Sequence, residues 1–175
     1  LYAVRLAPVR PEHLPIVQSA RHRRLVYIND GFGLFFHDGV KGAQHILDSL
    51  GHWRDGDWSV CCFGNIGGDL VNYPSAVGTL CGQGGWEMAR AGDHNVRDNL
   101  QGMIDAGIDP LQVAIDTAHA QGQQFWLYLR PQAYAADPPF DHILRSRFYS
   151  EHPEYRCLAA DGTAFSKLSI AYPVV

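Results

Sequence analysis

The clearest hydrophobic pattern in the chain is an amphipathic helix that leads at once into an apolar strand, between residues 109 and 130. Asp109 is a favoured N-cap, Pro110 suits the first helical position, and Gly122 can adopt the left-handed conformation that ends a helix. The apolar face of this helix carries Leu111, Ala114, Ile115 and Ala118. The connection to the strand at 124–130 is short, as in parallel α/β layers, where functional residues follow the carboxyl ends of strands.

Two further strand and helix patterns precede this unit. Apolar runs predict strands at 24–29 and 58–63, and the first of them ends in a polar, glycine-containing loop. Helical periodicity predicts helices at 41–50, stopped by Gly51, and at 95–106. Because consecutive strands joined by helices are usually parallel neighbours, we expect the three strands to lie side by side in one parallel sheet.

The remaining segments are less regular. Residues 1–23 are rich in proline and arginine and are expected to form an extended lead-in. The Gly-rich stretch 64–93 is much longer than a usual βα loop, and such loops are commonly functional. Residues 140–149 have a helical pattern, and Asp161-Gly162 predicts a hairpin turn within 156–168.

The order of these elements predicts an α/β fold of the (β/α)8, TIM-barrel type. A complete barrel usually needs about 250 residues, whereas three strands are used by residue 130 of this 175-residue chain. We therefore expect residues 24–175 to form only the N-terminal half of a barrel. Such a half has an open sheet edge, which the remainder of the barrel or self-association would have to cover.

Composition and charge narrow the function classes. Hydrophobic residues make up 46% of the chain and charged residues 18%, which suits a folded domain. The net charge of -4 provides no basic stripe, so nucleic acid is a poor partner, and no apolar run is long enough to span a membrane. The chain begins at Leu1 without a readable signal peptide, so the compartment stays open between secreted, periplasmic and other locations.

The four cysteines and the histidines do not form a recognisable metal motif. Cys61 and Cys62 are neighbours in a predicted strand and are expected to be buried as small hydrophobic residues. The pairs His37-Asp38 and Asp93-His94 lack a third ligand at metal spacing. We expect no metal and no cofactor, and no serine-hydrolase, P-loop or dinucleotide-binding motif is present.

Candidate binding residues follow the ends of the predicted strands. Asn29 and Asp30 close the first strand, where they could bind a substrate hydroxyl or simply form a turn with Gly31. Arg130 ends the third strand and could contact a sugar or form a structural ion pair.

Other candidates lie in loops. The aromatic rings of Tyr73, Trp86 and Tyr134 could stack on a sugar or pack within their own loops. His152 could point into a cleft or end the preceding helix together with Pro153. The acidic residues on the predicted loops are Asp30, Asp69, Glu87 and Asp137, and no motif pairs any two of them.

Several of these segments occur together in one known family. The relevant segments are Tyr27-Ile28-Asn29-Asp30, Tyr73-Pro74-Ser75, Asp109-Pro110-Leu111 with Ala118-His119-Ala120-Gln121-Gly122, His152-Pro153-Glu154-Tyr155, Asp161-Gly162 and Tyr172-Pro173-Val174. In order and spacing, residues 24–175 resemble the N-terminal half of the family-10-like glycosyl hydrolases, a group of bacterial (β/α)8 carbohydrate-active proteins. The resemblance implies a carbohydrate substrate, with the catalytic acids expected beyond Val175.

Three functions therefore stay under consideration. The first is a glycoside hydrolase or related carbohydrate-active enzyme that uses two carboxyl groups as acid and base. The second is a carbohydrate-binding barrel without hydrolytic activity. The third is a metal-dependent α/β hydrolase in which the family-like segments serve only as scaffold.

Overall fold

The computed structural model of the chain describes residues 11–13, 25–39, 42–52, 54, 56–64, 67–83, 90–130 and 145–169. A short 3-10 helix, η1 (Pro11–His13), is the described part of the expected lead-in. The main sheet has three strands in the order β1-β2-β5: β1 (Leu25–Asn29), β2 (Trp58–Gly64) and β5 (Gln124–Tyr128). Both neighbouring pairs are parallel, which confirms the predicted alignment of the three strands.

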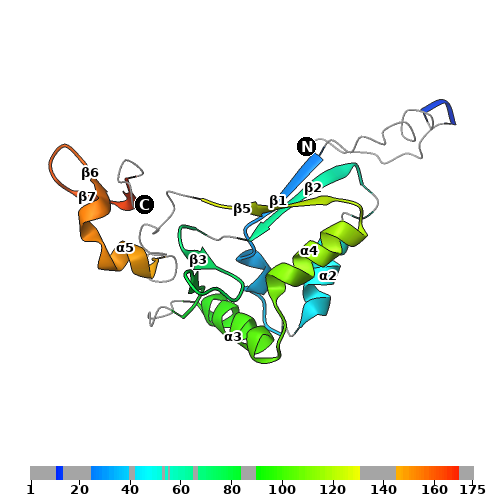
Figure 1. The fold of residues 1–175 in the computed structure, drawn as a ribbon, viewed down its shortest axis with the longest axis horizontal. Coiled ribbons are helices and arrows are strands. Elements are labelled where there is room, and N and C mark those ends of the chain that lie inside the picture. The colour runs from blue at the N-terminus through cyan, green and yellow to red at the C-terminus, as the bar shows by residue number, and fades with distance from the viewer. Residues whose placement is uncertain are drawn as a thin grey trace, which may run out of the picture.

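Helices cover one side of this sheet. Figure 1 shows α2 (Ala43–Gly51) and α4 (Pro110–Ala120) against that side, with α3 (Ala91–Asp105) beyond them. The core beneath the sheet is built around Phe35, Phe63, Ile46, Leu100 and Met103, each almost fully buried. On the opposite face, Ile28 and Trp126 are each 56% exposed, so the described helices leave that face uncovered.

The helix-strand unit forms as its sequence indicates. The carboxylate of Asp109 accepts hydrogen bonds from the backbone N–H groups of Leu111 and Gln112, and Pro110 opens α4. Gly122 has φ 69°, the left-handed conformation expected after the helix. By contrast, α3 begins at Ala91, four residues before the predicted start, because the buried Asp93 carboxylate accepts hydrogen bonds from the backbone N–H and the guanidinium of Arg90 there.

The Gly-rich loop contains structure that the sequence pattern did not predict. The short strands β3 (Leu70–Val71) and β4 (Thr79–Leu80) pair in parallel with each other and form a separate two-stranded sheet. Leu70 and Val71 are buried, so this small sheet contributes to the core rather than forming an open loop.

The C-terminal part is a small unit with its own apolar cluster. It consists of α5 (Arg147–Glu151), the 3-10 turn η3 (Pro153–Tyr155), and an antiparallel hairpin of β6 (Arg156–Leu158) and β7 (Ala164–Leu168). The hairpin is confirmed, although its loop is longer than a two-residue turn. The predicted helix at 140–149 begins only at Arg147, after the N-cap Ser146, and residues 140–144 lie outside the described part.

The predicted half of a (β/α)8 barrel is wrong. In a barrel, each new strand joins the growing parallel sheet, but β3 and β4 pair with each other outside the main sheet and β6 and β7 form an antiparallel hairpin. Within the described residues, the main sheet therefore contains β1, β2 and β5, and the other strands belong to two separate small sheets. The architecture is a small mixed α/β arrangement.

Candidate functional site

The parallel main sheet brings the carboxyl ends of its strands to one edge. Asn29 of β1 is level with Phe63 of β2, which in turn is level with Leu127 of β5. The residues that follow, Asp30 and Arg130, therefore leave the sheet at the same edge although they are a hundred positions apart in the chain.

An ion pair joins the first and last strands at this edge. Nη2 of Arg130 lies 3.1 Å from Oδ2 of Asp30, with the side chains 42% and 31% exposed. Nε of Arg130 donates to the Tyr128 hydroxyl at 3.1 Å, and the guanidinium lies 5.4 Å from the centre of the Tyr128 ring. The hydrogen bond to Tyr128 and the charge of Asp30 raise the pKa of Arg130. The pair is thus a half-buried, charged cluster that solvent or a ligand can reach.

Asp30 is held on two further sides. Its Oδ1 accepts a hydrogen bond from the Phe32 N–H at 3.1 Å, and its backbone carbonyl accepts one from Nδ2 of Asn72 at 3.3 Å. Asn72 is fully buried directly after β3. Between them, Gly31 has φ 76°, so the turn requires a residue that tolerates the left-handed region. Sequence reasoning missed Asn72, whose only signal is that it precedes the Tyr73-Pro74-Ser75 segment.

Asn29 supports the same turn from within. Its Oδ1 accepts from the Gly31 N–H at 2.7 Å, and its Nδ2 donates to the Tyr27 hydroxyl at 2.8 Å. Both polar ends of the amide are therefore used inside the protein. The position at the strand end is as expected, but the contacts indicate that Asn29 shapes the loop.

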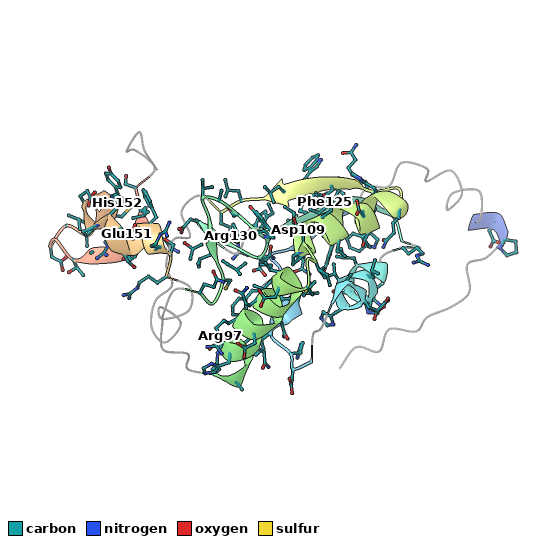
Figure 2. All side chains as sticks on the ribbon, turned by 60° about the horizontal axis from the view of Figure 1, so that its bottom comes forward. Arg97, Asp109, Phe125, Arg130, Glu151 and His152 are labelled. Carbon is teal, nitrogen blue, oxygen red and sulfur yellow. The ribbon has the colours of Figure 1, made fainter. Side chains whose placement is uncertain are left out.

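Tyr73 lies at the middle of the edge. Its ring lies close to Gly64, the last residue of β2, because a Cβ atom placed on Gly64 would be 3.9 Å from Cε1 of Tyr73. Partial burial, and secondarily the charge of Asp109, raise the pKa of the Tyr73 phenol. In Figure 2, Arg130 lies at the end of the main sheet and Asp109 at the start of α4. The structure therefore brings Asn29, Asp30, Tyr73 and Arg130 to one edge.

The other predicted residues are not part of this cluster. His152 lies in the C-terminal unit, where its Nδ1 is 2.9 Å from Oε1 of Glu154 and its ring stacks on Tyr155 and lies tilted against Phe148. Figure 2 shows His152 beside Glu151, in a different part of the molecule from Arg130. Trp86 and Tyr134 lie outside the described residues.

A groove lined in part by polar side chains opens beside Asp30. It has a volume of about 440 Å³ and lies between the loop after β1 and the side of α2. Besides Asp30, its polar lining includes His37, His45, Asp48, Ser49 and His52. Nε2 of His45 is 2.8 Å from the Leu34 carbonyl; because a carbonyl only accepts, the histidine donates and ties α2 to the loop. The sequence indicated this stretch as helix but did not single out its polar face.

The remaining acidic candidates contribute little to the edge. Asp69 accepts a hydrogen bond from the Thr79 hydroxyl at 3.0 Å and so links β3 to β4, while Glu87 and Asp137 lie outside the described residues. Two carboxylates, Asp30 and Asp48, line the groove. Within the described ranges, no group of three His, Cys, Asp or Glu side chains is arranged to hold a metal ion.

The cysteines behave as the strand pattern predicted. Cys61 and Cys62 are buried on opposite faces of β2, and burial raises the pKa of the Cys61 thiol to about 11. Among the described helices, none has the length and apolar character needed to cross a membrane. Comparison with known proteins finds neither a family model nor a curated protein that matches the chain.

Proposed function

We propose that this protein is a carbohydrate-active enzyme of the glycoside hydrolase type, in which Asp30 and Arg130 bind the hydroxyl groups of a saccharide. The observation that carries the proposal is the Asp30–Arg130 pair, which lies at the carboxyl edge of a parallel sheet, where Asp30 also lines a groove. Strand ends of this kind are where parallel α/β proteins bind ligands. The resemblance of the Tyr27–Asp30 and Tyr73–Ser75 segments to glycosyl hydrolases points to the same ligand class.

The chemistry of the pair suits hydroxyl groups. A carboxylate accepts hydrogen bonds and a guanidinium donates up to five, so together they can bind both partners of a vicinal diol. Glycoside hydrolysis further needs two carboxyl groups on either side of the bond that breaks. Asp48 is the second carboxylate that lines the groove, and we propose it as the acid or base partner of Asp30.

A second function, saccharide binding without hydrolysis, is favoured by one specific observation. Both oxygens of Asp30 are already engaged, Oδ1 by the Phe32 N–H and Oδ2 by Arg130. A carboxylate held in this way is suited to orienting a ligand, whereas a nucleophile needs one oxygen that can reach the anomeric carbon.

Two substitutions test the proposal and separate these functions. Asp30→Asn keeps the shape and removes the charge, and Arg130→Met keeps the stem and removes the donors. Arg97→Met is the matched control, because Arg97 is 41% exposed and paired with Asp98 but lies on α3. Binding is measured by calorimetry against a panel of soluble oligosaccharides, and hydrolysis by release of reducing ends.

We expect both site variants to weaken saccharide binding about tenfold or more, the effect of losing one charged hydrogen bond, and the control to bind normally. Loss of hydrolysis with binding retained in Asp30→Asn would assign a reacting role to Asp30. Binding in the unaltered protein without hydrolysis would favour the second function. If neither site variant changes binding or hydrolysis, the proposal is wrong.

A further inference from the structure

The groove beside Asp30 has one wall formed by a regular polar stripe on α2. His45, Asp48 and Ser49 of α2 and the C-cap residue His52, which continues the helical backbone, are spaced at i, i+3, i+4 and i+7, so they lie on one face. The stripe extends about 10 Å along the helix axis, given a rise of about 1.5 Å per residue. One wall of the groove therefore presents a row of hydrogen-bonding side chains.

The facing wall is fixed by the core. The 3-10 turn η2 (Gly33–Phe35) has Leu34 and Phe35 buried, and the Asn99 amide of α3 donates to the carbonyls of Phe35 and His37 at 2.9 Å each. The His45–Leu34 hydrogen bond then holds α2 against this turn. Because hydrogen bonds hold both walls in place, little conformational entropy would be lost in ordering them when a ligand binds.

The Asp, Glu, Lys and Arg residues that line the groove itself are two aspartates. Asp30 and Asp48 are both carboxylates, and none of the groove's described lining residues is lysine or arginine. Arg130 neutralises Asp30 at the sheet edge, but Asp48 is hydrogen-bonded to the neutral amide of Gln44 at 2.7 Å, and the described residues provide it with no ion pair. A negatively charged ligand in the groove would meet the Asp48 carboxylate.

We propose that this groove is a saccharide subsite that extends from Asp30 along α2 and selects sugars without negative charge. Imidazole, hydroxyl and carboxylate groups can each hydrogen-bond to sugar hydroxyls, and together they supply donors and acceptors along the row. Asp48 is the specificity-determining residue, because it accepts from hydroxyls and repels uronic acids. The inference rests on the proposed function for its ligand class; it shares Asp30 and Asp48 with the proposed site and adds Ser49 and the histidines of the groove.

Histidine ring signals in a ¹H–¹³C NMR spectrum provide the test. His37 and His52 line the groove, whereas the exposed His94 on α3 and His119 on α4 serve as internal controls. The probes are a neutral xylo-tetrasaccharide, a chitosan tetrasaccharide and a tetragalacturonate, each titrated to millimolar concentration. We expect the first two to shift the groove signals only and the acidic probe to shift none.

A matched pair of variants tests the role of Asp48. Asp48 accepts from Gln44 four residues earlier on α2, and Asp116 accepts from Gln112 in the same way on α4, at 2.9 Å. Asp48→Asn should weaken binding of the neutral probe severalfold and allow the tetragalacturonate to bind, while Asp116→Asn should bind all probes like the unaltered protein. The proposal is overturned if the control histidines shift as much as the groove histidines, if none of the probes shifts the groove signals, or if the acidic probe binds as well as the neutral one.

The same spectra distinguish failure of this inference from failure of the proposed function. Suppose that Asp30→Asn and Arg130→Met leave saccharide binding and hydrolysis unchanged while the His37 and His52 signals still shift. The saccharide subsite in the groove is then supported, and the proposed role of the Asp30–Arg130 pair is refuted. If Arg130→Met abolishes saccharide binding while the His37 and His52 signals do not shift in the unaltered protein, the subsite in the groove is refuted and the role of the ion pair is supported.

Discussion

The turn that presents Asp30 depends on close contact between Gly31 and Asn72. A Cβ atom on Gly31 would lie 1.8 Å from Nδ2 of Asn72, far inside van der Waals contact, and Gly31 has φ 76°. Gly31→Ala must therefore displace the buried Asn72 amide from the carbonyl of Asp30. We expect this substitution to destabilise the protein and to loosen the Asp30 turn.

The magnitude can be built from two contributions. A left-handed backbone costs an alanine about 1–2 kcal/mol. Breaking the Asn72–Asp30 hydrogen bond and leaving a buried amide unpaired adds about 1–3 kcal/mol. When Asn72 is already alanine, the second contribution disappears, whereas a tight contact with the Phe63 ring at 3.3 Å remains in both backgrounds and cancels. The double-mutant cycle should therefore give a coupling energy of about 1–3 kcal/mol.

Urea unfolding of four proteins measures this coupling: the unaltered chain, Gly31→Ala, Asn72→Ala and the double variant, compared at constant slope of free energy against urea. Gly107→Ala is the control, because Gly107 has φ 73° but nothing near its Cβ position. It should cost about 1–2 kcal/mol whether or not Asn72 is present. A Gly31→Ala cost that is equal in both backgrounds would refute the reasoning, since the contact would then carry no energy.

Two further predictions concern the helix cap and the buried thiols. Asp109→Ala should lower the free energy of unfolding by about 1 kcal/mol through loss of the α4 cap, whereas Asp116→Ala in the same helix should change it by less than half of that in the same urea assay. Burial raises the pKa of Cys61 to about 11 and that of Cys81 to about 12, so the folded chain keeps protons that unfolded thiols release near pH 9. These thiols should therefore leave the free energy of unfolding unchanged below about pH 9 and lower it above that pH, by up to about 1.4 kcal/mol per pH unit for each thiol. In urea unfolding between about pH 8 and 10, the double variant Cys61→Ala with Cys81→Ala should show a smaller decrease.

Sequence signals were enough to predict a helix where its capping residues lie directly beside it in the chain. Asp109, Pro110 and Gly122 are all within a few residues of the helix that they bound, so α4 and the strand after it could be predicted. The strands β3 and β4 are only two residues long and their apolar positions show no alternation, so a periodicity argument could not find them. The barrel prediction failed for a related reason: helical spacing and strand order predict that neighbouring strands pair in parallel, but they do not determine whether later strands join the same sheet.

The same limit separates the predicted from the unpredicted parts of the site. Asp30 and Arg130 could be found because each follows a recognisable strand and parallel strand ends share an edge. Asn72 could not, because its role is a contact with a backbone carbonyl 42 residues away.

The polar face of α2 shows how such a feature is overlooked. By periodicity, a row of His, Asp and Ser opposite the buried Ile46 and Leu50 is the usual solvent face of an amphipathic helix. It becomes the wall of a groove only because the η2 turn is anchored to α3 by Asn99 and to α2 by His45. A surface stripe therefore becomes a candidate site through tertiary contacts that its own sequence does not encode, and the test of its function has to address those side chains directly.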